Sequence, residues 1–397
     1  MNFAAFSISR LPRISFGEGR FKELPGLLAG YGQSVLIVTG KQSLVATARW
    51  QTLTEALESK AVRWHHFTVS GEPSPQLVDA AVAELSGQRI DAVAAIGGGS
   101  VLDAAKAIAG LLPTGHSVMD YLESVGKNLP YHGPSTPFIA VPTTAGTGSE
   151  ATKNAVLSIQ GPEGFKKSFR DECLVPEYAI IDPELLETCP RELIAADGMD
   201  ALTQLLESYV SLKANPFIDA LAWSGMSAVQ QGFFAALDGT GSQAAVGRAA
   251  MAYAALLSGI TLAQVGLGSV HGLASPLGAY FPIPHGVVCG TLVGAATQVN
   301  IQALQARQPE HPSLRKYAQV GRLLTGQNDL NDQAALTALV ELLTEWSDLL
   351  QLPHLGQYGI TSADLPLIIA NSRGSSMQTN PIVLTDDEIC SILLQRL

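Results

Sequence analysis

The sequence predicts a protein of two parts, an α/β N-terminal domain with a mostly parallel sheet and an all-helical C-terminal domain. Short β-branched runs alternate with helical stretches up to about residue 187, and this rhythm is typical of a parallel sheet with helices on both faces. Longer stretches with apolar residues at helical spacing follow, with almost no strand pattern. The length of 397 residues also suits two or three domains of about 150 residues each. We therefore predict domains at 1–187 and 188–397.

The strands expected in the first part are short apolar runs that end at glycine or at a polar turn. The run SVLIVTG at 34–40 is the clearest, because an unbroken β-branched run is typical of a buried parallel strand. Further strands are expected at 63–71, 91–97, 137–144 and 177–183, with helices near 47–60, 74–87 and 101–112. In the second part, helices are expected at 199–212, 216–235, 245–264 and 332–351, and the clearest late loop is 371–381.

Composition indicates a soluble cytoplasmic protein whose partners are small molecules. The net charge of −11 is spread along the chain without a basic face, which argues against nucleic acid as a partner. The N-terminus has no apolar run of signal length, and no window of about 20 residues is apolar throughout, so no membrane span is expected. The four cysteines lie far apart and are expected to be reduced thiols: Cys173, Cys189, Cys289 and Cys390.

A glycine turn follows the predicted strand at 91–97 and opens a predicted helix. Its residues are Gly97, Gly98, Gly99 and Ser100. Glycines let backbone N–H groups approach a pyrophosphate, and the N-terminus of a helix favours negative charge. The sequence is not the GxGxxG fingerprint, so a tight turn that needs positive φ is the ordinary alternative.

A second polar loop follows the next strand. Thr143, Thr144, Thr147 and Ser149 offer hydroxyls that suit a phosphate, a ribose or a nicotinamide amide. The ordinary alternative is a surface turn rich in Ser and Thr. In a doubly wound, Rossmann-like sheet both loops would lie at the carboxyl ends of the strands, where ligands bind.

The helical part supplies four candidate metal ligands from three segments. Asp200 and Gln204 are four residues apart, so they share one face of a helix. His271 and His285 stand in the segment GSVHGLASPLGAYFPIPHG, where Gly272 and Gly286 directly follow them and would permit close packing. A carboxylate with imidazoles suits Zn²⁺ or Fe²⁺. Taken singly, Asp200 could pair with a cation and His271 could be an ordinary interior histidine.

Four ordered motifs together resemble the iron-containing (group III) alcohol dehydrogenase family. They read IGGGSVLDAAKAIA, VPTTAGTGSEAT, GMDALTQLLESYVS and GLGSVHGLASPLGAYFPIPHG. The resemblance implies an architecture shared with dehydroquinate synthase. It also implies reversible oxidation of an alcohol or reduction of an aldehyde or ketone, with NAD(P)(H) and usually a divalent metal, in a chain that is expected to be a homodimer.

The resemblance also assigns roles to individual residues. The cofactor would be held by Gly97, Gly98, Gly99, Ser100, Thr143, Thr144, Thr147 and Asn154, by Lys166 near the ribose, and by Ser74 and Asp103. The metal would be held by Asp200, Gln204, His271 and His285. The catalytic residues would be His271, His285 and Lys166. Without a metal, either imidazole would serve as a proton donor or hydrogen-bond donor.

The chain departs from the family's pattern at two places near the metal. The metal helix normally reads D-A-x-x-H, whereas this chain reads DALTQ, which places Gln204 where a histidine ligand is expected. Ser275 stands where many members carry a second histidine near the substrate. Because a neutral amide oxygen is a weaker ligand than imidazole, we expect weaker metal binding, by Fe²⁺ or Zn²⁺.

A third departure concerns the choice of cofactor. Members that use NAD carry an aspartate after the strand VLIVT, and this carboxylate binds the adenosine ribose. This chain has Gly40 there, followed by Lys41 and, two residues on, Ser43. Loss of the carboxylate removes repulsion toward a 2′-phosphate, and Lys41 and Ser43 would contact that phosphate. We therefore predict a preference for NADP, with NAD also possible.

Three other functions stay open at this point. A lyase of the dehydroquinate-synthase type would share the fold, cofactor and metal. A metal-independent reductase of the maleylacetate type would explain the altered ligand set. A non-catalytic, cofactor-binding regulatory protein would retain the fold after losing a ligand histidine.

Overall fold

The computed structural model describes residues 5–397, and the chain divides into two compact units. The first, here called the α/β unit, comprises Ser9–Ile159 and Gly164–Cys189. The second, the helical unit, consists mainly of Pro190–Leu397. The parallel N-terminal sheet and the helical C-terminal part confirm the predicted fold class. The predicted domain boundary at residue 187 stays a prediction.

The α/β unit contains a six-stranded sheet in which all neighbouring strands are parallel. The strand order is β1-β8-β5-β4-β2-β3. The strands are β1 (Arg13–Phe16), β2 (Ser34–Gly40), β3 (Arg63–Val69), β4 (Ala92–Gly97), β5 (Phe138–Pro142) and β8 (Tyr178–Ile181). A separate antiparallel hairpin, β6 (Asn154–Ile159) and β7 (Phe165–Arg170), was not predicted, and neither was β1.

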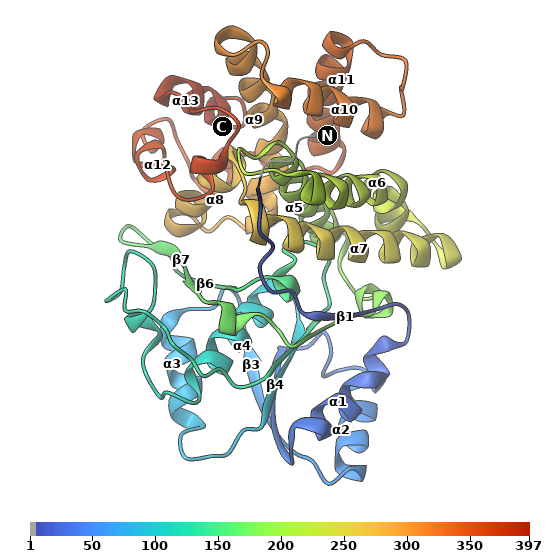
Figure 1. The fold of residues 1–397 in the computed structure, drawn as a ribbon, viewed down its shortest axis with the longest axis vertical. Coiled ribbons are helices and arrows are strands. Elements are labelled where there is room, and N and C mark those ends of the chain that lie inside the picture. The colour runs from blue at the N-terminus through green and yellow to red at the C-terminus, as the bar shows by residue number, and fades with distance from the viewer. Residues whose placement is uncertain (1–4) are drawn as a thin grey trace. The chain divides into compact units, whose positions relative to one another are not determined.

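Helices cover both faces of this sheet (Figure 1). Val35 and Ile37 of β2 pack in one core with α1 (Leu24–Tyr31) and α2 (Ala48–Ser59). Leu36 and Val38, which point to the opposite face, pack in a second core with α3 (Pro75–Glu84) and α4 (Gly99–Leu111). Since both faces of β2 are buried, its sequence is apolar throughout instead of alternating.

The topology reverses beside β2, between β3 on one side and β4 on the other. The chain pairs β3 with one side of β2 and then crosses to place β4 on the other side. In doubly wound sheets, ligands bind outside the carboxyl ends of the strands where the order reverses. Thr39 is in register with Ile96, so Gly40 and Gly97 end neighbouring strands at that edge.

In the helical unit, the described residues form helices and no strand. The helices are α5 (Arg191–Val210), α6 (Pro216–Asp238), α7 (Gly241–Val265), α8 (Ser269–Tyr280), α9 (His285–Arg307), α10 (Pro312–Thr325), α11 (Asp332–Leu349), α12 (Leu365–Asn371) and α13 (Asp386–Leu394). α5 packs against α6, α7 and α9, and its last two turns are buried on every side. A helix that is buried all round loses the amphipathic pattern of a surface helix and carries its polar side chains into the core.

Two helices of this unit, α7 and α9, are long and apolar enough to cross a membrane by length and composition alone. The apolar window of α9 is 89% buried and that of α7 is 61% buried inside the structure. Most of each window therefore packs against protein inside the helical unit.

Candidate metal and cofactor sites

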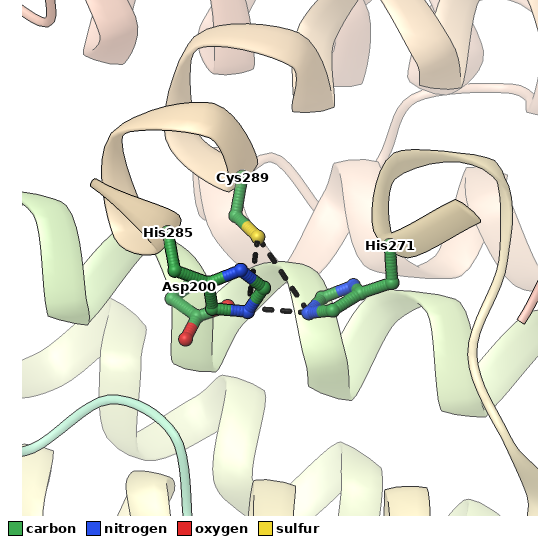
Figure 2. Close-up of side chains that lie close together, drawn as sticks. All are labelled: Asp200, His271, His285 and Cys289. Carbon is green, nitrogen blue, oxygen red and sulfur yellow. Dashed lines mark hydrogen bonds and ion pairs between the residues drawn. The ribbon is translucent and has the colours of Figure 1, made fainter. Parts of the chain in front are cut away.

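Four side chains from three helices meet inside the helical unit. Asp200 comes from α5, His271 from α8, and His285 and Cys289 from α9 (Figure 2). One donor atom from each lies within 4.8 Å of the others. The structure thus brings together three of the four side chains expected from the sequence. It adds Cys289, to which the sequence analysis assigned no role.

The spacing of these donor atoms suits one metal ion. Asp200 Oδ1 lies 3.2 Å from His271 Nε2 and 3.8 Å from His285 Nε2. Cys289 Sγ lies 3.6 Å from His271 Nε2 and 3.8 Å from His285 Nε2. A tetrahedral Zn²⁺ with bonds of about 2.0–2.3 Å holds its donors about 3.3–3.8 Å apart. These four separations are close to those of a tetrahedral site, and all four donor atoms lie within 4.8 Å of one another, so the residues present fit a metal ion.

Asp200 is an anion held in the core. Its side chain is fully buried, because it stands in the enclosed part of α5. Burial alone would raise the pKa of this carboxyl, but the His285 and His271 side chains outweigh that effect and lower the pKa to about 2. The carboxylate is therefore ionised at neutral pH and can hold a cation.

Glu207 orients His271 toward the donor cluster, and the sequence analysis did not identify it. Its Oε2 lies 2.7 Å from His271 Nδ1, and its Oε1 accepts a 2.7 Å hydrogen bond from the Val270 N–H. With Nδ1 held by Glu207, Nε2 faces the cluster, and its lone pair would become available when a metal ion displaces the proton there. A Cβ at Gly268 would lie 2.8 Å from Glu207 Oε1 and 2.9 Å from Asn380 Oδ1, so a side chain there would have to displace one of these groups.

Buried neighbours change the acidity of His271 and Cys289. Burial opposes charge on His271, but Cys289, Asp200 and Glu207 together raise the pKa of its imidazole well above 6.5. Burial, reinforced by Asp200, raises the pKa of the Cys289 thiol to about 12. The thiol is thus protonated unless a cation stabilises the thiolate.

Gln204 is buried beside this cluster, with both ends of its amide engaged. Its Oε1 accepts a 2.8 Å hydrogen bond from Ser258 Oγ. Its Nε2 lies 3.4 Å from Asp200 Oδ2, the oxygen opposite the one that faces the histidines. In this arrangement Gln204 supports Asp200.

The glycine turn of the α/β unit lies close to the Thr-rich loop that follows β5. A Cβ at Gly99 would lie 2.7 Å from Thr147 Oγ1, and one at Gly98 would lie 3.3 Å from Thr144 Cγ2. The Thr143 N–H donates to the Gly97 carbonyl at 3.0 Å, which joins the two predicted loops directly. α4 begins at Gly99, so its first N–H groups point from this turn.

A buried lysine, Lys106, secures the second loop and was also missed from the sequence. Its Nζ donates to the Ser149 carbonyl at 2.8 Å, to the Asn154 carbonyl at 2.7 Å and to Thr152 Oγ1 at 3.0 Å. Ser149 Oγ in turn donates to Asp103 Oδ1 at 2.5 Å. Burial lowers the pKa of Lys106 to about 8, although Asp103 and Glu150 oppose the shift. Through these hydrogen bonds Lys106 ties the loop that carries Ser149 and Thr152 to α4.

The other predicted cofactor residues have ordinary contacts in the structure. Ser74 Oγ caps α3 by accepting from the Leu77 N–H at 3.1 Å. Lys166 Nζ on β7 lies 3.3 Å from Glu72 Oε2. Lys41 and Ser43 are exposed just after Gly40. Cofactor roles for these residues stay predictions.

Comparisons with known proteins decide the family. Residues 12–183 match the family described as "Iron-containing alcohol dehydrogenase", and residues 194–397 match "Fe-containing alcohol dehydrogenase family, C-terminal". The chain belongs to the iron-containing alcohol dehydrogenase family. Within that family it is an oxidoreductase that acts on alcohol groups with a nicotinamide cofactor, as the sequence motifs predicted.

Individual members of the family show the same relationship. The chain is 29% identical to alcohol dehydrogenase 4 of Saccharomyces cerevisiae over 389 residues, which is 96% of each chain. It is 33% identical to alcohol dehydrogenase 4 of Schizosaccharomyces pombe over 285 residues, or 71% of this chain and 63% of that relative. The crystal structure of a 1,3-propanediol oxidoreductase superposes with a TM-score of 0.87 at 28% identity, covering 99% of this chain and 100% of the other.

Two site residues of this iron-containing alcohol dehydrogenase that the sequence analysis did not identify, Glu207 and Cys289, stand at helical spacing from predicted ligands. Glu207 is seven residues after Asp200, two helical turns along the same face. Cys289 is four residues after His285, one turn along α9. Each spacing becomes informative once the helix that carries it is known.

Proposed function

We propose that this family member is a metal-dependent alcohol dehydrogenase or aldehyde reductase that prefers NADP and acts on a small alcohol or carbonyl substrate. The observation that carries this proposal is the convergence of Asp200, His271 and His285 on one point. Such a donor set fits Fe²⁺ or Zn²⁺. It favours this function over a metal-independent reductase.

The residues of the helical unit would hold the metal ion that acts on the substrate oxygen. When bound, a divalent ion lowers the pKa of an alcohol and polarises a carbonyl. Asp200 supplies the fixed negative charge, while Glu207 keeps the Nε2 lone pair of His271 directed inward. Because the cofactor supplies the hydride chemistry, the protein's part is to bind, orient and balance charge.

The α/β unit would hold the cofactor. The turn from Gly97 to Ser100 supplies backbone N–H groups for the pyrophosphate at the start of α4. Thr143, Thr144, Thr147 and Asn154 would line the nicotinamide and ribose side, with Lys166 near the ribose. At the end of β2, the absence of a carboxylate at Gly40 and the exposed Lys41 favour the 2′-phosphate of NADP.

We further propose a cytoplasmic homodimer. β1 stands at the edge of the sheet, and its Ile14 and Phe16 are 43% and 36% exposed. An exposed apolar edge strand is a ready surface for pairing with another chain. A second copy that covers β1 would satisfy this edge.

The test combines metal analysis with kinetics. Purified protein is expected to contain close to one divalent ion per chain and to reduce small aldehydes with a higher kcat/KM for NADPH than for NADH. His271→Ala is expected to lose both the metal and the activity while the circular dichroism spectrum stays unchanged. Wild-type turnover in His271→Ala would refute the metal-dependent mechanism, and a clear NADH preference would refute the cofactor assignment.

A further inference from the structure

We propose that the thiolate of Cys289 is the fourth protein ligand of the metal site, and that this donor set selects Zn²⁺ over Fe²⁺. The proposal rests on the proposed function for the presence of a metal. It departs from the expectation that Gln204 completes the ligand set.

The placement of Cys289 is that of a ligand. It follows His285 by one turn of α9, so the two side chains point to the same side of the helix. Its Sγ lies 3.6 Å from His271 Nε2 and 3.8 Å from His285 Nε2 (Figure 2). These separations equal the edges of a tetrahedron around a metal with ordinary bond lengths, about 3.3–3.8 Å.

The surroundings of Cys289 differ from those of a packing cysteine. A buried free cysteine ordinarily behaves as a small hydrophobic residue among apolar neighbours. Cys289 has no exposed surface, yet it faces the carboxylate of Asp200 and two imidazoles. The other three cysteines are exposed or half-buried and belong to no such donor cluster among the described residues.

Gln204 makes hydrogen bonds to residues other than the two histidines. Its amide oxygen, the one atom of this side chain able to ligate a metal, accepts from Ser258 Oγ at 2.8 Å. Its amide nitrogen faces Asp200 Oδ2, so Oδ1 is left to face the histidines. Gln204 is therefore placed to position Asp200, and Cys289 supplies the fourth donor that faces the two histidines.

The chemistry of the donor set decides the ion. Two imidazoles and one carboxylate alone suit non-haem Fe²⁺ as well as Zn²⁺. A thiolate is a soft ligand, which Zn²⁺ accepts in four-coordinate sites, and such a site would bind the substrate oxygen by expanding to five ligands. On binding, the S–H bond of Cys289 breaks, the proton leaves to water and the sulfur lone pair bonds to the ion.

The first test uses Co²⁺ as a spectroscopic probe in the full-length protein after removal of metal by chelation. Wild-type protein loaded with Co²⁺ is expected to show a sulfur-to-cobalt charge-transfer band in the near ultraviolet. Cys289→Ser is expected to lose that band but to keep the visible ligand-field bands, with Zn²⁺ affinity reduced by more than the roughly 10–100-fold cost of removing an outer partner. Cys390→Ser, a change outside the site, is the matched control and should resemble wild type.

A double variant and a measurement on wild type complete the test. Gln204→His combined with Cys289→Ser replaces the sulfur donor by imidazole, and it is expected to recover Zn²⁺ affinity without the charge-transfer band. X-ray absorption of the Zn²⁺-loaded wild type should show one sulfur at about 2.3 Å, and this measurement does not depend on a variant that folds.

The outcomes separate this proposal from the proposed function. Bound metal with no sulfur in the X-ray absorption, or an unchanged band in Cys289→Ser, would overturn the role of Cys289 and leave the metal-dependent function standing. Failure of wild type to bind Co²⁺ or Zn²⁺ would overturn both. Tighter binding of Fe²⁺ than of Zn²⁺ would overturn the metal selectivity.

Discussion

At the scale of single residues, Glu207 does two things with one carboxylate. Oε1 accepts from the Val270 N–H at the start of α8, and Oε2 holds Nδ1 of His271. Both groups facing it are donors, so the site needs two acceptors 2.7 Å away on either side. A carboxylate provides them, and an amide of the same shape does not.

We therefore expect Glu207→Gln to weaken metal binding by about 10–100-fold. If the amide nitrogen faces His271, it forces the imidazole proton onto Nε2, the atom that faces the cluster. If the amide oxygen faces His271, the nitrogen meets the Val270 N–H and the start of α8 is disturbed. The measurement is a Zn²⁺ titration in competition with a chelator. Glu192→Gln, an exposed change on the same helix, serves as control, and equal affinities would contradict the role of Glu207.

At the scale of elements, the turn between β4 and α4 depends on glycines, because a Cβ there would clash with neighbouring side chains. Gly99 and Thr147 approach so closely that a Cβ at position 99 would lie 2.8 Å from Thr147 Cγ2. Distances under 3.0 Å are not tolerated without a shift of one partner. The Thr147 side chain would thus have to shift, and its hydroxyl would shift with it.

Gly99→Ala is expected to weaken NADPH binding by about ten- to hundredfold, since overpacking of this kind costs about 1–3 kcal/mol. Quenching or enhancement of cofactor fluorescence on titration measures the effect. Gly26→Ala in α1 is the matched control, because a Cβ there meets nothing within 4 Å. That control should bind NADPH like wild type, and alanine in a helix should stabilise it slightly. Unchanged binding by Gly99→Ala would contradict a cofactor site at this turn.

The short helical turn at Ser149–Ala151 carries a buried acid that predicts a pH dependence of stability. Burial raises the pKa of Glu150 from 4.5 to about 7, although Lys106 lowers it in part. A raised folded pKa means that this contribution to stability is complete below pH 4.5 and is lost as the pH rises through about 7. Glu150→Gln should flatten the stability profile across this range and raise the free energy of unfolding above it by about 1–3 kcal/mol. Denaturant unfolding at several pH values measures this, and parallel profiles would refute it.

The elements themselves were largely predictable from sequence. The runs that form β2, β4 and β5 are apolar throughout because both faces of the sheet are covered, and such unbroken runs can be recognised directly in the sequence. β1 was missed because it is only four residues long and lies at an exposed edge, where two apolar residues alternate with two polar ones. Cys289 and Lys106 were missed for another reason: their roles depend on which side chains approach them from other segments, and spacing along the chain does not specify this.

At the scale of the whole molecule, the two halves of the chemistry lie in separate compact units. The four proposed metal donors and Glu207 belong to the helical unit, whereas the glycine turn, the Thr-rich loop and Lys106 belong to the α/β unit. The sequence analysis expected the same division, since the predicted cofactor motifs precede residue 187 and the predicted ligand motifs follow it. Metal and cofactor can thus be tested independently of each other.

The exposed edge of the sheet predicts how the chain assembles. Ile14→Asp places a charge on β1, where apolar contact with a second copy would be buried, and burying an unpaired charge is costly. We expect this variant to be a monomer with half the wild-type mass by light scattering. Leu367→Asp, at an exposed apolar position on α12, should stay a dimer. A monomeric wild type would refute the homodimer, and a dimeric Ile14→Asp would place the interface elsewhere.

The double contact of Glu207 makes a single backbone amide a reporter of the metal. The Val270 N–H and the His271 ring share one carboxylate, so any cation that draws charge from the imidazole also changes the field at that amide. In a nuclear magnetic resonance spectrum, the Val270 signal should therefore shift as the ion is titrated. Such a signal would follow loading in solution for ions that have no colour, Zn²⁺ among them.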